Sequence, residues 1–285
     1  MARRKGNHGK GKSSRKGSSK AHRGESAKHP QITDRLQNPS GKIYKQKELS
    51  FALQVNANRL YAEVQDRLSH ADIAILRGDI PDVTSKTDLT RLLNIWLRIL
   101  DKALFFNLIR RGIRKQDPLV VYEKVDDMHG ACWSMGKRTY ITLNRLPEYN
   151  QHGSIAQCFI GTLAHEMLHA FFHLYSCESC SHCKKRMGAR KGGEGKLGHG
   201  PTWCNAIVKI QKALQLQLGW EVNTYHARSI AIEMRNSGWV PRDDQIERWE
   251  LTEFDLEAMA EDEEDDEDNE WEDDEQQLFC LCTTM

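Results

Sequence analysis

Residues 154–175 have the sequence SIAQCFIGTLAHEMLHAFFHLY, and they predict a long, buried helix. Ser154 and Gln157 match the capping-box pattern of a helix start. Apolar residues then recur at three- and four-residue intervals, namely Ile155, Phe159, Leu163, Met167, Ala170 and Phe171. This stripe predicts a core-facing surface, and it leaves His165, Glu166 and His169 together on an adjoining face.

His165, Glu166 and His169 form a His-Glu-x-x-His pattern, which indicates a metal site. Residues i and i+4 of a helix lie on one face, so both imidazoles can bind one Zn²⁺ while Glu166 lies beside them as a general base. The alternative is a pair of partly exposed histidines without a ligand, which arises in helices by chance. The surrounding apolar sequence favours the metal site.

A catalytic zinc site needs a third protein ligand, and the sequence offers three candidates. His173 continues the i+4 series, but on a straight helix it lies about 12 Å from His165. Glu194 has suitable chemistry, yet it falls in a Gly- and Lys-rich segment that is typical of a flexible loop. His199 is therefore the preferred third ligand.

The residues after His199 favour this choice. Gly200 permits unusual backbone angles, and Pro201 suits the first turn of the helix predicted to follow it. A ligand at the start of such a helix is held by a rigid element on its C-terminal side.

The segment His165–Ala170, followed by Gly198–Trp203, resembles the SprT-like zinc metallopeptidase family, whose eukaryotic members include the Spartan DNA–protein crosslink proteases. The resemblance spans roughly residues 86–235 and includes the segments Leu100–Phe105, Gly130–Trp133, Tyr140–Leu143 and Thr224–His226. It implies an α+β, zincin-like peptidase. Catalytic Zn²⁺ bound by His165, His169 and His199 lowers the pKa of water in such a site, and Glu166 takes the water proton.

The chain departs from that family in its cysteines. Many members carry a cysteine zinc ribbon after the catalytic region, whereas residues 205–279 here contain no cysteine. Instead, three cysteines with Cys-x₂-Cys spacing lie between the two halves of the metal site: Cys177, Cys180 and Cys183. They can hold a second, structural Zn²⁺ with His182 or His173 as the fourth ligand. The alternative is a cysteine-rich loop without a metal.

Charge divides the chain into three parts. Residues 1–30 contain ten Lys or Arg and a single acidic residue, whereas residues 253–275 contain sixteen acidic residues and no basic one. Neither segment can bury a core, so we expect a basic disordered arm over residues 1–40 and an acidic disordered tail over residues 251–285. The peptidase domain is expected over residues 44–250, with its core at 86–235. The net charge of +1 is a cancellation, because the two ends carry +9 and −16 and the residues outside them carry +8.

The basic arm suits the phosphates of nucleic acid, through Arg3, Arg4, Lys5, Lys10, Lys12, Arg15, Lys16 and Lys20. Such an arm also suits nuclear import, and the alternative is a solvated tail with no dedicated partner. We expect a nuclear location, with the cytoplasm as the alternative, and DNA or chromatin as a partner. No membrane partner is expected, because the chain has neither a secretory h-region nor an apolar span. The sequence does not predict an oligomeric state.

Periodicity predicts helices over residues 48–71 and 88–111, then strands over 119–123, 131–135 and 140–143, with a turn at Gly136 and Lys137. A further helix is expected to end near Gly238, before a less regular segment in which Trp239 and Trp249 serve in packing. The fold class is therefore α+β, with a small antiparallel sheet packed on the metal-site helices. An extended substrate is expected to add to the sheet edge near 140–143.

Three functions fit these features. The first is a zinc endopeptidase acting on DNA-associated or DNA-crosslinked proteins, which the resemblance implies. The second is a zinc peptidase with another protein substrate, because a fold does not choose its target. The third is a non-catalytic chromatin-binding adaptor with a structural metal. Glu166 argues against the adaptor, since a structural site has no need of that carboxylate.

Overall fold

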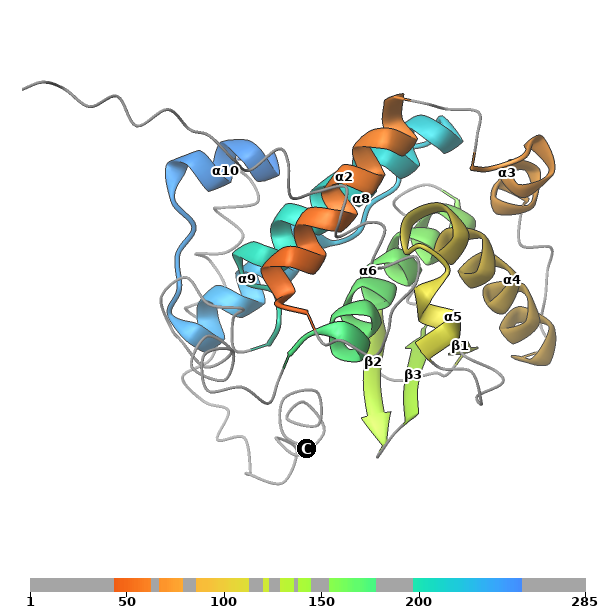
Figure 1. Ribbon diagram of the computed structural model, residues 1–285, viewed down its shortest axis with the longest axis horizontal. Coiled ribbons are helices and arrows are strands. Elements are labelled where there is room, and N and C mark those ends of the chain that lie inside the picture. The colour runs from red at the N-terminus through yellow and green to blue at the C-terminus, as the bar shows by residue number, and fades with distance from the viewer. Residues whose placement is uncertain are drawn as a thin grey trace, which may run out of the picture.

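The computed structural model describes residues 44–62, 67–78, 86–112, 120–122, 129–135, 138–144, 154–177 and 197–252. The described helices are α2 (Gln46–Ala62), α3 (His70–Arg77), α4 (Lys86–Leu104), α5 (Leu108–Gly112), α6 (Ile155–Tyr175), α8 (Pro201–Leu218), α9 (His226–Ser237) and α10 (Asp243–Trp249). The strands are β1 (Val120–Tyr122), β2 (Gly130–Met135) and β3 (Arg138–Leu143). The described chain is α+β, as predicted (Figure 1). None of its helices has the length and apolarity needed to span a bilayer.

Helix α6 lies at the centre of this arrangement. The capping box is confirmed, because Ser154 Oγ accepts the N–H of Gln157 while Gln157 Oε1 accepts the N–H of Ser154. Strands β2 and β3 contact α6 on one side, and α2, α4, α5 and α8 contact it elsewhere, with α2 and α8 lying side by side (Figure 1). Since almost every residue from Ala156 to Phe172 is buried, polar groups on α6 face protein rather than solvent.

The sheet has three strands in the order β1–β3–β2. The predicted antiparallel pairing of the second and third strands is confirmed, with Cys132 opposite Ile141 and Trp133 opposite Tyr140. However, β1 pairs with β3 in parallel, so the sheet is mixed rather than antiparallel. Residues 140–143 belong to the central strand, which has a neighbour on each side. The expected substrate edge at 140–143 is therefore wrong, and the edge strands on the two sides of β3 are β1 and β2.

Two predicted helices are shorter than periodicity indicated. The first ends at Ala62, and α3 begins after Ser69, whose side chain forms a capping box with Asp72. The second ends at Leu104, because Phe106 and Asn107 adopt positive φ values of 59° and 58°. A continuous apolar pattern therefore conceals a turn between α4 and α5.

The buried side chain of Asp101 stabilises this turn. Its two carboxylate oxygens accept the N–H groups of Ile109 and Arg110, each at 3.1 Å. Its backbone carbonyl also accepts the N–H groups of Phe105 and Asn107. Burial raises the pKa of Asp101 to about 6, so the carboxyl group is mostly ionised at neutral pH and bonds the start of α5 as an anion.

The C-terminal part of the described chain has two helices. Helix α9 ends at Ser237 with Gly238 as a left-handed cap, as predicted. The segment expected to be irregular instead contains α10, whose Trp249 is fully buried and donates through Nε1 to Asn205 Oδ1 at 2.9 Å. The rings of Trp239 and Trp249 lie 5.8 Å apart, which confirms that these tryptophans serve in packing.

The N-terminal end of the described chain is joined to the end of α6. The N–H of Tyr44 donates to the carbonyl of Tyr175 at 2.8 Å, and the N–H of Cys177 donates to the carbonyl of Tyr44 at 2.7 Å. The basic arm, the acidic tail from residue 253, the turn at 136–137 and residues 178–196 lie outside the described residues.

Replacing Asp101 by Ala is expected to lower the free energy of unfolding by about 1–3 kcal/mol, because buried N–H groups lose their acceptor. Urea denaturation measures this change. The matched control is Asp88→Ala on the same helix, whose side chain is 55% exposed and forms an ion pair with exposed Arg91. Equal losses for the two variants would contradict a role for Asp101 in holding the turn.

Candidate metal centre

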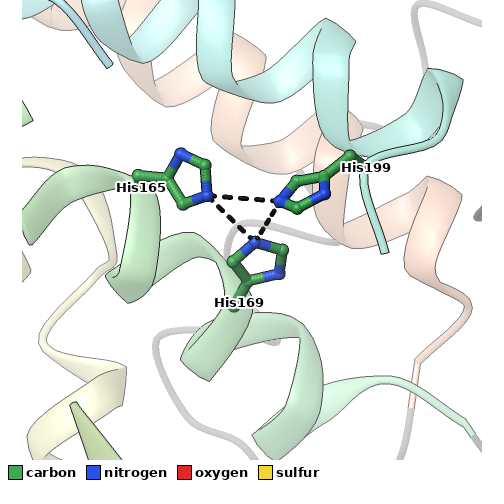
Figure 2. Close-up of side chains that lie close together, drawn as sticks. All are labelled: His165, His169 and His199. Atoms are coloured by element: carbon green, nitrogen blue, oxygen red, sulfur yellow. Dashed lines mark hydrogen bonds between the residues drawn. The ribbon is translucent and has the colours of Figure 1, made fainter. Parts of the chain in front are cut away.

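Three histidines from two elements converge in the described part of the chain. His165 and His169 project from successive turns of α6, and His199 lies just before the start of α8. Figure 2 shows their rings pointing toward one another. The Nε2 atoms are separated by 3.2 Å for His165 and His169, 3.0 Å for His169 and His199, and 3.3 Å for His165 and His199. The predicted pair and the preferred third residue are thus brought together.

The other proposed third ligands are not part of this group. His173 lies one turn beyond His169 on α6 and is not a member of the cluster. Glu194 lies outside the described residues, as do Cys180, His182 and Cys183 of the proposed second site. Cys177 lies after α6, where it is half-buried and forms no disulfide with another described residue. The arm residues Arg3 to Lys20 are also outside the described range, so the second metal and the nucleic-acid contacts stay predictions.

The tautomer of His165 follows from its neighbour. Its Nδ1 lies 2.9 Å from the carbonyl oxygen of Thr224, which can only accept, so Nδ1 carries the proton and Nε2 presents a lone pair. Thr224 is itself held by Gln211 of α8, whose Oε1 accepts both the Thr224 N–H at 2.9 Å and its hydroxyl at 2.7 Å. The orientation of His165 is thereby set from a second helix.

The spacing of the three Nε2 atoms fits a metal ion. At metal–nitrogen distances of about 2.0–2.1 Å, two imidazole nitrogens of a tetrahedral zinc site lie about 3.3 Å apart. The observed separations of 3.0–3.3 Å match that value. Three neutral imidazoles cannot satisfy one another around a triangle once His165 directs a lone pair inward, whereas a cation accepts a lone pair from all three. The cluster can therefore hold a metal ion.

Burial keeps the three imidazoles neutral. Desolvation lowers the pKa of His165 to about 4, with the charges of neighbouring histidines as a lesser cause. The same desolvation lowers the pKa of His169 and of His199 well below the ordinary value. Because metal ligands must be deprotonated, this site is ready for a cation at neutral pH without first releasing protons.

Trp203 packs against one side of the histidine cluster. Its fully buried ring contacts all three imidazoles, stacking on His169 with 20° between the planes and meeting His165 and His199 edge-on. Centroid distances are 5.5 Å to His169 and 4.7 Å to each of the others. The Trp203 ring restricts the orientation of the three imidazole rings and keeps water from the side of the cluster that it covers.

Glu166 completes the site without joining the three ligands. One of its carboxylate oxygens lies 3.9 Å from Nε2 of His165, and the residue is only 5% exposed. Burial raises the pKa of Glu166 to about 8, while a hydrogen bond from the backbone N–H of Cys132 in β2 opposes that rise. A carboxyl group with this pKa can exchange protons near neutral pH, which suits a general acid–base role.

Gly198 places His199 in the cluster. The prediction that Gly200 supplies unusual backbone angles is wrong, since its φ of −71° is ordinary, and Pro201 does begin α8 as predicted. Gly198 has the positive φ, at 87°, and a side chain there would lie 3.5 Å from the His169 ring. The glycine before the ligand, rather than the one after it, makes the turn.

Sequence patterns did not identify three supporting residues. Gln211 holds Thr224, whose carbonyl contacts the His165 ring. Glu233 holds the backbone of residues 197–199, and Gly161 allows residues 223–224 to pass beside α6. The position of Glu233 in the sequence could have indicated its role, because it falls on the same face of α9 as the buried residues His226, Ile230 and Ser237. A charged residue on such a face requires a partner.

Without the Glu166 carboxyl group, metal affinity is expected to depend little on pH above pH 6. The lowered pKa values mean that protons compete for the imidazoles only in acid, so in Glu166→Gln, which removes the nearby carboxyl group with its pKa of about 8, affinity should stay within about threefold between pH 8 and 6 and fall below about pH 5. Titration with a divalent metal at each pH measures this. A tenfold loss between pH 7.5 and 6 would instead indicate exposed histidines with ordinary pKa values near 6.5.

Gly161→Ala is expected to weaken metal binding at least tenfold, the usual effect of disturbing a ligand's support. A Cβ at this position would lie 1.8 Å from the carbonyl oxygen of Asn223, so the segment carrying Thr224 must move away from His165. Gly78→Ala is the control, because its nearest contact is at 3.3 Å and lies far from the cluster in the chain. Unchanged affinity in Gly161→Ala would show that Thr224 does not matter to His165.

Comparisons of the chain with family models, with curated proteins and with solved structures found no match. Function therefore has to be argued from the chemistry of the site. The observations that carry such an argument are three converging, neutral imidazoles and a buried carboxyl group beside them.

Proposed function

We propose that the protein is a zinc-dependent metalloendopeptidase. The single observation that supports this most strongly is the placement of Glu166, with a carboxylate oxygen 3.9 Å from Nε2 of a converging histidine. Three histidines with one position left open is the ligand set typical of a catalytic zinc. A structural site, in contrast, is usually closed by four protein ligands, and the group in the described chain has three members.

Each of these side chains has a distinct role in the proposed reaction. A zinc ion bound there supplies Lewis-acid chemistry, which acidifies water and polarises the scissile carbonyl group. His165, His169 and His199 hold the ion as neutral ligands. Glu166 takes the proton of the attacking water as the C–O bond forms at the scissile carbonyl, and then passes that proton to the amine nitrogen, so that the C–N bond breaks and the amine leaves.

The burial of Glu166 favours an enzyme over an adaptor. Burying the Glu166 carboxyl group to 5% exposure lowers the free energy of unfolding, and a purely structural metal site does not need that group. The single backbone N–H from Cys132 leaves the group able to bind or release a proton. A carboxyl group that is buried, beside the ligands and able to change protonation state is what the hydrolytic step requires.

Strand β2 is the proposed binding edge for the polypeptide substrate. It is an edge strand of the described sheet, and its Cys132 N–H points at Glu166 rather than at β3. An extended peptide that pairs with this edge passes beside the general base, and main-chain hydrogen bonds would hold it there. Such binding depends little on substrate sequence.

Proteins bound or crosslinked to DNA are the substrate class that we propose. The resemblance to SprT-like peptidases supports this class, as does the basic composition of residues 1–30, which suits phosphate contacts and a nuclear location. The second candidate is a zinc peptidase with substrates unconnected to DNA, because the metal site itself does not select a target.

Glu166→Gln is expected to keep the metal and the fold but to lower the rate of proteolysis by about 10²-fold or more, because only the base is lost. Metal content and substrate cleavage are measured on the same sample. His169→Ala should lose the metal, whereas His173→Ala, one turn further along α6, should keep both metal and activity. Activity of Glu166→Gln within tenfold of wild type would leave the general-base role without support.

The substrate class is tested by incubating the protein with a DNA-binding protein in the presence and absence of single- and double-stranded DNA. Cleavage that needs both DNA and Glu166 supports DNA-linked substrates. Cleavage that needs Glu166 alone supports the second candidate. Metal binding without any cleavage would favour the adaptor.

A further inference from the structure

The third ligand, His199, lies in a short segment that needs its own support. Residues 197–200 precede α8 without forming a helix, and Gly198 turns the backbone through a positive φ of 87°. His165 and His169, in contrast, are fixed by the regular hydrogen bonding of α6. Of the three ligands, His199 therefore depends most on side-chain contacts to its backbone.

Glu233 supplies such contacts. This residue of α9 is fully buried, and its Oε2 accepts the N–H of Leu197 at 2.8 Å and the N–H of His199 at 3.3 Å. Hydrogen bonds from backbone N–H groups to a carboxylate are charge-assisted and strong when buried. A single oxygen thus spans Gly198 and holds the backbone on both sides of it.

Helix α9 also supports the other half of the metal site. The residue two positions before its start, Thr224, fixes His165 through its carbonyl oxygen. About two turns further along, Glu233 fixes the backbone of His199. His165 and His199 come from different elements, but both are held by contacts from α9 or from the residues just before it. These contacts can fix the distance between the two ligands whatever the conformation of the long segment between α6 and α8.

We propose that Glu233 is a positioning residue for the metal centre. It acts through His199, by holding the backbone of residues 197–199 so that Nε2 meets the other two imidazoles. The proposal rests on the metal site of the proposed function but not on peptide hydrolysis. Its consequence is that removing the Glu233 oxygen should weaken metal binding without removing any ligand.

Two substitutions separate the hydrogen bonds from the charge. Glu233→Met removes the acceptor while keeping a side chain of similar length, and Ni²⁺ affinity should fall by about 10–100-fold, the usual effect of losing a ligand's supporting partner. Glu233→Gln keeps an oxygen that can accept both N–H groups and should recover most of that affinity. Ser237→Ala is the control, because Ser237 is a buried residue of α9 whose hydroxyl donates to the Glu233 carbonyl and accepts the Trp239 N–H, away from residues 197–199.

A double-mutant cycle tests whether Glu233 acts through His199. In a His199→Ala background, Glu233→Met should cause no further loss of Ni²⁺ affinity, since the ligand that it positions is gone. Equal losses in both backgrounds would show a general effect on the fold and overturn the proposal. The cysteine insert is the same in all variants, so any metal that it binds cancels in the comparison.

Wild-type protein provides a test that does not depend on a variant folding. The amides of Leu197 and His199 should be protected from hydrogen exchange in the metal-free protein, because Glu233 already holds them. Fast exchange there would overturn the proposal even if Glu233→Met were unfolded. Two results separate this proposal from the proposed metal site. Unchanged Ni²⁺ affinity in His169→Ala would contradict the metal site itself. Unchanged Ni²⁺ affinity in Glu233→Met would contradict only the positioning role of Glu233.

Discussion

Three neutral imidazoles packed against one another inside the protein are the constraint on which the rest of the structure depends. Desolvation keeps each ring neutral, with His165 buried and His169 and His199 half-buried, yet the three Nε2 atoms must also converge, and they lie 3.0–3.3 Å apart. Burial follows from the central position of α6, which is covered by the sheet on one side and by helices elsewhere. Aim follows from polar contacts that reach α6 and the start of α8 from other elements, through Thr224, Gln211 and Glu233.

Local spacing was sufficient to predict the helix and its ligand pair, because a 3.6-residue period places i and i+4 together whatever surrounds them. His199 was also predictable, from the proline that starts α8. Features that depend on distant contacts were not. The turn at 105–107 exists because Asp101 can bond the start of α5, and α10 exists because Trp249 finds Asn205 some forty residues away. The parallel pairing of β1 likewise has no signature in a three-residue strand.

Two buried carboxyl groups flank the cluster in contrasting environments. Glu166 receives a single backbone N–H, and burial raises its pKa to about 8. Glu233 accepts two backbone N–H groups through one oxygen and touches the ligand segment rather than the open side of the cluster. The first group lies beside the proposed metal position, and the second holds the backbone that carries a ligand. One residue type thus serves both the proposed chemistry and the scaffold.

The backbone bridge between Tyr44 and the end of α6 joins parts of the molecule that the sequence separates by more than a hundred residues. Tyr44 follows the basic arm, which is expected over residues 1–40, and Cys177 is the first cysteine of the insert. Movement of the chain at Tyr44 therefore reaches the last turn of the helix that carries two metal ligands, and the first residue of the segment that leads to the third. Tyr44 and the metal centre are in this way mechanically linked through two backbone hydrogen bonds.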